Sequence, residues 1–206
     1  MGGLPGILRF PCQNTRVSID GSLVRTLNTW GEHHRTLIRI CSSDLVYVVM
    51  LLAVLWFCAK MLQAHPLSHG WQELVRNLLA KSIIIFLIPV GIATTISELI
   101  SAIYLRQRPF VVDSRIKLLV PHSADGGMPS HHIVFMSALI VTVFFYGRKT
   151  GIFLGLLTLL TGIARVAAGI HYPSDIIVGA LIGAGVAYLY RWAFVNIFDQ
   201  RRLRLN

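Results

Sequence analysis

Three short segments of the chain combine side chains that can bind an anion with side chains that can carry a proton. They are residues 106–109, 126–132 and 164–175, and they supply three arginines, a predicted helix N-terminus, three histidines and one aspartate. Phosphoryl transfer requires mainly in-line positioning of the reactants and stabilisation of negative charge. The three segments therefore predict a phosphoryl-transfer site, provided that the fold brings them together.

The second segment has the pattern of a helix N-terminus. Ser130 is a favourable N-cap residue, and Gly126 and Gly127 allow a close approach of the backbone. Free N–H groups and the positive end of the helix dipole make such a terminus an anion site. A phosphate there would favour the protonated imidazole of His132, which would then act as a proton donor. The alternative for this segment alone is an ordinary cap followed by two surface histidines.

The third segment places a carboxylate one helical turn after a histidine. Asp175 follows His171 by four residues, and a carboxylate that holds one imidazole nitrogen leaves the other free as nucleophile or base. Arg165 lies near the end of an apolar run, where a charge is costly without a partner. The alternative here is a capping aspartate beside an unrelated histidine.

The first segment ends a helix at a proline. Pro109 stops the helix, so Arg108 would point from the membrane boundary into the loop layer. Taken alone, an arginine at this position is usually an anchor at the lipid interface. The polar residues of these three segments contain neither a carboxylate cluster nor HxxxH spacing, so we expect no metal and no cofactor.

The composition indicates the elements that must position these residues. The chain has 206 residues, 54% hydrophobic and 14% charged, whereas soluble domains carry about 25% charged residues. Runs of about 20 apolar residues can cross a bilayer as helices. We predict an all-α polytopic transmembrane bundle with about five spanning helices, at residues 44–62, 74–104, 132–146, 151–168 and 174–198.

The N-terminal segment, residues 1–43, differs from the transmembrane domain at 44–198 and from the basic tail at 199–206. Arginines alternate with apolar residues over 22–40, which predicts an amphipathic helix at the interface or packed onto the bundle. The alternative is a disordered basic tail. The net charge of +10 is scattered over flanks and loops, which favours lipid headgroups or anionic lipids as partners over nucleic acid.

The predicted spans place both polar connections, 106–131 and 166–173, on one face of the membrane. The opposite face receives Arg148, Lys149 and the basic tail, and short basic loops favour the cytoplasm. The site would then face the periplasm or the cell exterior, although a basic N-terminus beside it would favour the reverse.

The order and spacing of the candidate residues resemble the type 2 phosphatidic acid phosphatase superfamily. The family signature is KxxxxxxRP, PSGH and SRxxxxxHxxxD. The matching residues here are Arg108-Pro109, Pro129-Ser130-x-His132 and Arg165-x5-His171-x3-Asp175. Within the superfamily, residues 106–110, 119–124 and 129–132 look most like the bacitracin-resistance type of undecaprenyl-diphosphate phosphatase.

The resemblance implies a role for each matching residue. His171 would attack phosphorus to form a phosphohistidine, with Asp175 orienting it, and His132 would protonate the leaving oxygen. The transferred phosphate would be bound by Arg108, Arg165 and Ser130.

Three positions depart from the family pattern. Ser101 stands where the first motif has its lysine, and we hypothesise that Arg106 or Lys117 replaces that phosphate contact. His131 stands in place of the glycine of the second motif, and Ala164 in place of the serine before the arginine. None of the three removes a residue of the acid–nucleophile pair.

The resemblance implies a multi-pass enzyme of the bacterial inner membrane. The expected reaction is hydrolysis of undecaprenyl diphosphate to the monophosphate, which recycles the lipid carrier of cell-wall synthesis. The alternative substrates are lipid A, phosphatidylglycerol phosphate and phosphatidate. A different class of function is a catalytically silent lipid-binding or transport protein, against which the intact His132, His171 and Asp175 argue.

Overall fold

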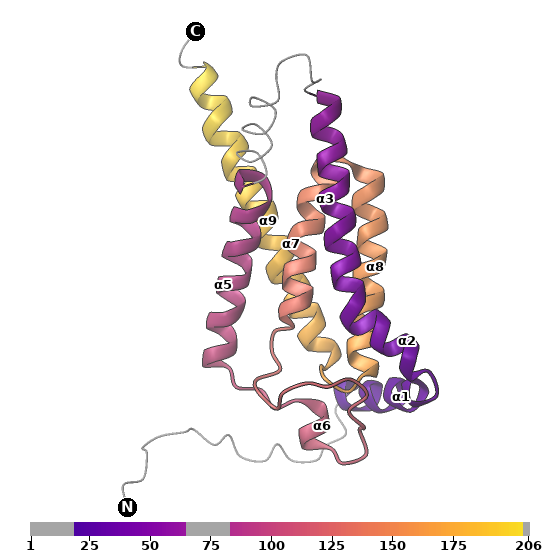
Figure 1. The fold of residues 1–206 in the computed structure, drawn as a ribbon. Coiled ribbons are helices and arrows are strands. Elements are labelled where there is room, and N and C mark those ends of the chain that lie inside the picture. Colours follow the sequence, from indigo (N-terminus) through magenta and orange to yellow (C-terminus); the bar gives the residue numbers. More distant parts are fainter. Residues whose placement is uncertain (1–18, 65–82, 204–206) are drawn as a thin grey trace, which may run out of the picture.

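The computed structural model describes residues 19–64 and 83–203, and every regular element in this part of the chain is a helix. Five helices run alongside one another and form the body of the molecule (Figure 1). They are α3 (Leu45–Ala64), α5 (Ile88–Ile103), α7 (His131–Tyr146), α8 (Arg148–Ala167) and α9 (Pro173–Leu203). The shorter elements are α1 (Ile19–His33), α2 (Arg35–Arg39), α6 (Pro109–Val112) and two π-helical turns, η1 (Ile40–Asp44) and η3 (Ile83–Leu87).

The predicted all-α transmembrane bundle is confirmed. Four helical stretches are long and apolar enough to cross a membrane, at Arg35–Lys60, Ile84–Ile103, Arg148–Ala167 and Pro173–Ile197. The fifth predicted span, α7, is apolar but has only 16 residues, about 24 Å at 1.5 Å per residue. It is shorter than the hydrocarbon layer of about 30 Å. The predicted start of the second span, residues 74–82, lies outside the described residues.

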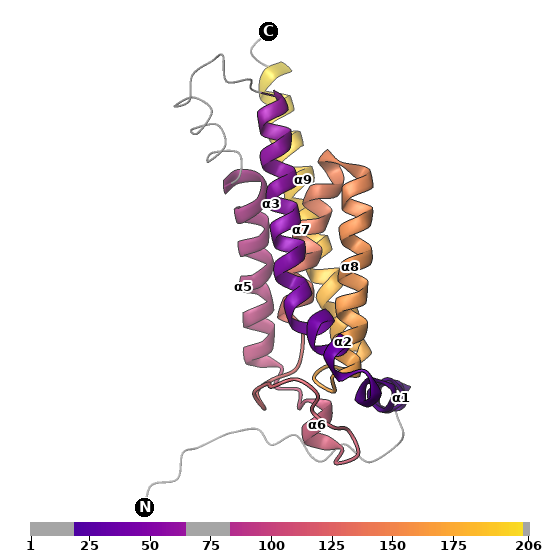
Figure 2. The ribbon, with the colours of Figure 1, turned by 45° about the vertical axis from the view of Figure 1, so that its right-hand side comes forward.

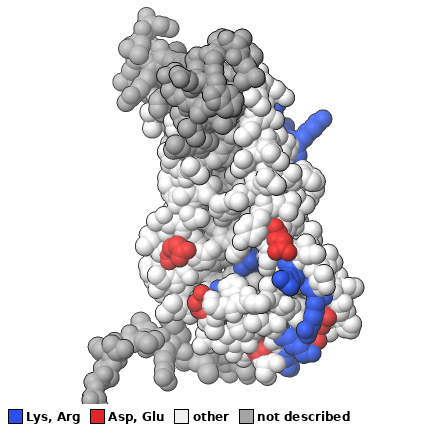
Figure 3. Space-filling model, viewed as in Figure 1, with Lys and Arg blue, Asp and Glu red and all other residues white. Residues whose placement is uncertain are grey.

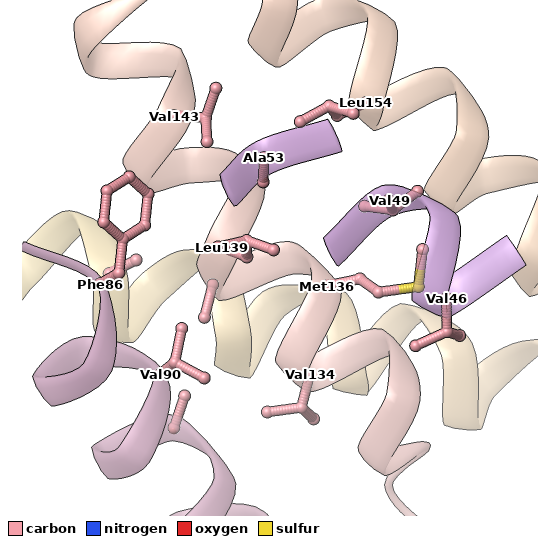
Figure 4. Packing of buried hydrophobic residues seen from close by; sticks show 13 residues of the cluster. Val46, Val49, Ala53, Phe86, Val90, Val134, Met136, Leu139, Val143 and Leu154 are labelled. Atoms are coloured by element: carbon pink, nitrogen blue, oxygen red, sulfur yellow. The ribbon is translucent and has the colours of Figure 1, made fainter. Parts of the chain in front are cut away.

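The apolar core is built around α7. Its buried residues Val134, Met136 and Val143 pack against Val49 of α3 and Val90 of α5 (Figure 4). Many large apolar side chains on the outer faces of the helices are exposed instead, as a lipid environment requires. The centre of the bundle is therefore α7, which carries His132 in its first turn.

Small residues allow α9 to approach α7 closely. Gly179 and Gly183 have the spacing of a GxxxG motif, and such residues let two membrane helices come into backbone contact. A Cβ atom at Gly179 would lie 3.0 Å from the carbonyl oxygen of Ser130. One at Gly183 would overlap the carbonyl oxygen of Val134. This contact sets the start of α7 against the first turns of α9.

The N-terminal helix α1 lies across one end of the bundle, beside the loops (Figures 1 and 2). Its buried Asn28 donates to the carbonyl oxygens of Ala167 and Lys117 at 2.8 and 2.9 Å. The Asn28 amide oxygen accepts from the backbone N–H of Lys117 at 2.8 Å. The helix predicted over 22–40 is thus present, divided at His34, and α1 packs on the bundle.

Charged side chains gather toward the same end of the molecule. On the face shown in Figure 3, most of them lie at the loop end, below a broad band without charge. The band matches the apolar middle of the spanning helices. On this face the loop end is therefore polar and the middle of the bundle is apolar.

Candidate functional site

A polar pocket of about 300 Å³ lies at the loop end of the bundle. It brings together four of the seven predicted site residues: Arg108, His132, Arg165 and His171. The complete lining is Glu98, Ser101, Arg108, His122, Asp125, Gly126, His131, His132, Arg165 and His171. The three segments of the sequence prediction thus converge in space.

Backbone contacts between loops fix the arginine of the first segment. The N–H of Phe110 donates to the carbonyl oxygen of Gly169 at 3.2 Å, and that of Leu119 to Ala168 at 3.2 Å. Gly169 has a φ of +78°, which favours glycine, and a Cβ there would lie 2.9 Å from the carbonyl oxygen of Lys117. The loop that carries Arg108 is therefore held against the connection between α8 and α9.

The side chain of His171 is buried, with one nitrogen bonded to backbone and the other directed at the arginines. Its Nδ1 lies 2.8 Å from the carbonyl oxygen of Gly127, which can only accept. Nδ1 therefore carries the proton, and Nε2 presents a lone pair. Nε2 lies 3.2 Å from a terminal nitrogen of Arg165 and 3.5 Å from one of Arg108. A phosphate held by the two arginines would lie in front of this nitrogen.

Asp175 is adjacent to His171 but does not make the expected hydrogen bond. Its Oδ2 is 3.7 Å from His171 Nδ1 and accepts the backbone N–H of Tyr172 at 2.7 Å. The reason is geometric, because Tyr172 precedes the first turn of α9 and its N–H needs an acceptor. Gly127 supplies the partner that the sequence assigned to Asp175.

Arg108 is buried, and its N–H groups are all directed at acceptors. Nε and one terminal nitrogen donate to Asp125 at 3.1 and 2.7 Å, and the latter also donates to Gly126 O. The other terminal nitrogen donates to Ile170 O at 3.0 Å and faces His171. Asp125 is the exposed and charged member of this set, so it is the partner that a phosphate can replace most easily.

Two buried polar atoms near the pocket have no partner in the structure. One is Nε of Arg165, whose terminal nitrogens reach Ser42 O at 3.0 Å and His171. The other is Oγ of Ser130, which is the N-cap residue of α7 but makes no side-chain capping bond. Buried groups of this kind are costly unless a ligand completes them.

Arg106 and Lys117, the candidates to replace the missing lysine, are engaged elsewhere. Arg106 donates to Asp175 at 2.6 Å and to Asp20 at 2.9 Å, and it is not among the residues that line the pocket. Lys117 bonds Glu32 of α1 at 2.6 Å. Ser101, where the family has its lysine, does line the pocket.

The pocket also contains residues that the sequence did not single out. His122 lies edge-on to His171 with 6.3 Å between ring centroids. Glu98 pairs with His131 at 2.9 Å on the side of α5 and α7. Of His122 and Glu98, only His122 could have been expected near the site from the sequence, because it falls within residues 119–124, which resemble the undecaprenyl-diphosphate phosphatase branch.

Burial and positive charge keep the loop histidines neutral. Burial, Arg165 and Arg108 lower the pKa of His171 well below its ordinary value of 6.5, and burial with Arg108 also lowers the pKa of His122. Hydrogen bonds from Ser123 and Arg108 lower the pKa of Asp125. Near neutral pH the pocket thus combines the neutral imidazole of His171 with two guanidinium groups. Within the described residues, no group of three His, Cys, Asp or Glu side chains has the arrangement of a metal site.

Three curated sequence relatives each match about half of this chain. Undecaprenyl-diphosphatase BcrC of Bacillus subtilis is 36% identical over 101 residues, covering 48% of this chain and 52% of that protein. Undecaprenyl-diphosphatase of Sulfolobus acidocaldarius is 31% identical over 99 residues, or 48% of each chain. Bacitracin transport permease protein BcrC of Bacillus licheniformis is 28% identical over 101 residues, covering 49% of this chain and 50% of that protein. The chain spans about half the length of these curated relatives.

Solved structures share the fold at low sequence identity. LpxE of Aquifex aeolicus superposes with a TM-score of 0.60 and 19% identity, over 85% of this chain and 96% of that one. The first transmembrane PAP2 type phosphatidylglycerolphosphate phosphatase from Bacillus subtilis gives 0.57 and 18%, over 88% and 85%. The PAP2 superfamily model matches residues 82–199, which include every motif position at the pocket. This multi-pass membrane protein therefore belongs to the PAP2 superfamily.

Proposed function

We propose that this protein is a membrane lipid phosphatase that hydrolyses undecaprenyl diphosphate to undecaprenyl phosphate and inorganic phosphate. The observation that carries the proposal is the arrangement of His171, whose Nε2 lies beside two buried arginines in the lining of a polar pocket. The names of two relatives support the choice of substrate. Such an enzyme would recycle the lipid carrier of peptidoglycan synthesis and contribute to bacitracin resistance.

The first chemical step in this proposal transfers the terminal phosphoryl group to His171. Nε2 attacks phosphorus, the P–N bond forms, and the bond from phosphorus to the bridging oxygen breaks. His132 donates a proton to that oxygen, which leaves as undecaprenyl phosphate. Arg108, Arg165 and Ser130 bind the equatorial oxygens of the transferred group.

The second step releases the phosphate. Water attacks the phosphohistidine, the P–N bond breaks, and His132 takes a proton from the water. Gly127 holds Nδ1–H throughout, so the attacking nitrogen remains Nε2. The carboxylate of Asp175, 3.7 Å from Nδ1, stabilises the positive ring of the intermediate.

The proposed location is the bacterial inner membrane, with the pocket at its outer boundary. The loop end would face the periplasm or cell exterior, and the turn with Arg148 and Lys149 would face the cytoplasm. The diphosphate would enter the pocket while the polyprenyl tail stays among the apolar outer faces of the helices.

The test is phosphate release by the purified protein in detergent, with wild type, His171→Ala and, as a histidine control, His33→Ala on the exposed side of α1. The substrates are undecaprenyl diphosphate, phosphatidate and phosphatidylglycerol phosphate. We expect release from the diphosphate that disappears in His171→Ala and persists in His33→Ala.

The other outcomes separate the alternatives. Release only from a monophosphate would keep the mechanism and favour a lipid phosphatase or phosphotransferase of another specificity. Release that survives His171→Ala would contradict the assigned nucleophile. No release from any lipid phosphate, with lipid binding retained, would favour the silent binding or transport protein that one relative's name suggests.

A further inference from the structure

A charged network lies behind His171, on the side away from the pocket. Arg106 donates from one terminal nitrogen to Asp175 at 2.6 Å and from the other to Asp20 of α1 at 2.9 Å. Asp175 is fully buried, and the side chains of Arg106 and Asp20 are 24% and 23% exposed. One guanidinium group therefore joins a carboxylate beside His171 to a carboxylate of the N-terminal helix.

The same network holds the first turn of α9. The Asp20 carboxylate accepts the backbone N–H of Ser174 at 3.1 Å and also the Ser174 hydroxyl. Asp175 accepts the backbone N–H of Tyr172. Both N–H groups lie at the start of α9, where no carbonyl oxygen of the preceding turn is available to accept them. Asp20 thus supplies a helix cap from a distant part of the chain.

Arg106 is poorly placed to bind the transferred phosphate itself. Both of its terminal nitrogens donate to carboxylates, and its guanidinium group lies over the Tyr172 ring at 4.1 Å from the centroid. Burial alone would lower the pKa of Arg106, but the charges of Asp175 and Asp20 raise it. The group is a permanent cation committed to two anions.

We infer that Asp20 and Arg106 are positioning residues that hold Asp175, and through it the backbone at His171, in the geometry for attack on phosphorus. The inference rests on the proposed function, because it assigns these residues a role in phosphoryl transfer to His171. It makes α1 part of the catalytic unit.

The electrostatic reason is that the network has one cation between two anions. If Arg106 is lost, Asp20 and Asp175 remain close together without the charge that separates them. If Asp20 is lost, Arg106 keeps Asp175 as its single carboxylate partner, and the terminal nitrogen that bonded Asp20 no longer fixes the orientation of the guanidinium group. Either change allows the 171–175 turn to shift, and small shifts of a nucleophile cost a large factor in rate.

The test compares kcat and KM for undecaprenyl diphosphate in Asp20→Asn, Arg106→Lys and the double variant. Lysine keeps the charge but cannot bridge two carboxylates with a planar fork. We expect kcat to fall about 10-fold or more in each single variant, with KM within about twofold, because the phosphate contacts are unchanged. The double variant should be no slower than the slower single variant, as for residues that act as a unit.

Arg25→Gln is the matched control. Arg25 also lies on α1 and forms an ion pair with Asp113 at 2.8 Å, but this pair does not reach the 171–175 turn. Its loss should loosen α1 to a similar extent and leave kcat near the wild-type value. A similar drop in kcat in Arg25→Gln would mean that α1 acts only through general stability, and the inference would fail.

Two further results would overturn it. A rise in KM for Arg106→Lys without any effect of Asp20→Asn would make Arg106 a direct phosphate contact. Wild-type kcat in both single variants would remove the network from catalysis. His171→Ala in the same assay tests the proposed function separately from the network. If that variant stays active, the proposed function fails, whatever the network variants show.

Discussion

A phosphate that enters the pocket meets two arginines in different states. Arg165 keeps an unpartnered Nε, whereas Arg108 already has acceptors for its donors, and one of them is the carboxylate of Asp125. The incoming anion must therefore displace or accommodate Asp125 on Arg108. Asp125, which lies outside the three motifs, therefore competes with phosphate for Arg108 and weakens phosphate binding.

Removal of this charge should strengthen phosphate binding. In Asp125→Asn we expect inorganic phosphate to inhibit about 3- to 10-fold more strongly, because Arg108 loses a competing carboxylate whose own side chain is exposed, and repulsion of the anion is also relieved. The measurement is the inhibition constant of phosphate. Asp113→Asn is the control, since the Asp113 carboxylate pairs with Arg25 and Arg115 and does not line the pocket. Weaker inhibition in Asp125→Asn would show that Asp125 organises Arg108 instead of competing for it.

The pH dependence follows from the neutral state of His171. Burial and both arginines lower the pKa of His171 below 6.5. Nε2 is therefore protonated, and unable to attack phosphorus, only when the pH falls below that lowered pKa. We expect the acid limb of kcat/KM, which reports protonation of His171, to lie below pH 6.5, whereas any fall at higher pH would report the general acid His132. A pH series of initial rates measures this. An acid limb at or above pH 6.5 would contradict the burial of the nucleophile.

Residue spacing predicted the centre of the site but not its surroundings. Arg108, His132, Arg165 and His171 could be found because each lies at a fixed offset within a short motif. The partners of Arg108 and His171 could not, because Asp125 and Gly127 reach them through an irregular loop. The place of Asp175 differed because the exposed N–H groups at a helix start compete for its carboxylate.

The positions of the helices could be predicted from the local sequence, whereas the contacts between distant helices could not. Apolar runs predicted α3, α7, α8 and α9 within a few residues of their observed ends. The contact of Asp20 with Arg106 and Ser174 spans 86 and 154 residues of sequence, and no local pattern carries it. Helix formation depends on neighbours in the chain, whereas this contact depends on where α1 packs.

The α7–α9 contact offers a test of element packing. Gly183→Ala should destabilise the bundle by about 1–3 kcal/mol, because the added methyl group overlaps the carbonyl oxygen of Val134. Gly185→Ala, two residues along the same helix, meets nothing within 4 Å and should leave stability unchanged or slightly higher. Thermal unfolding in detergent measures both. Equal melting temperatures for the two variants would show that α9 can move away from α7 without cost.

The orientation of the whole molecule can be tested by labelling. In a protein whose native cysteines are replaced, Ser123→Cys reports the pocket end and Lys149→Cys the opposite end. We expect a membrane-impermeant maleimide to label Ser123→Cys in intact cells and Lys149→Cys only after lysis, because basic short turns favour the cytoplasm. The opposite pattern would place the pocket on the cytoplasmic side, as the basic N-terminal segment by itself would favour.

The π-helical turn at Ile40–Asp44 has a consequence for exchanging parts between relatives. Such a turn holds one residue more than an α-helical turn. Here it joins α1 and α2, of which α1 carries Asp20, to the spanning helix α3. Deletion of one residue from it would rotate everything before it by about 100° around the helix axis. Asp20 would then leave Arg106, and Asn28 would leave Ala167. A chimera that takes its first 40 residues from another member of the superfamily must therefore conserve the residue count across this turn, even where it conserves no side chain.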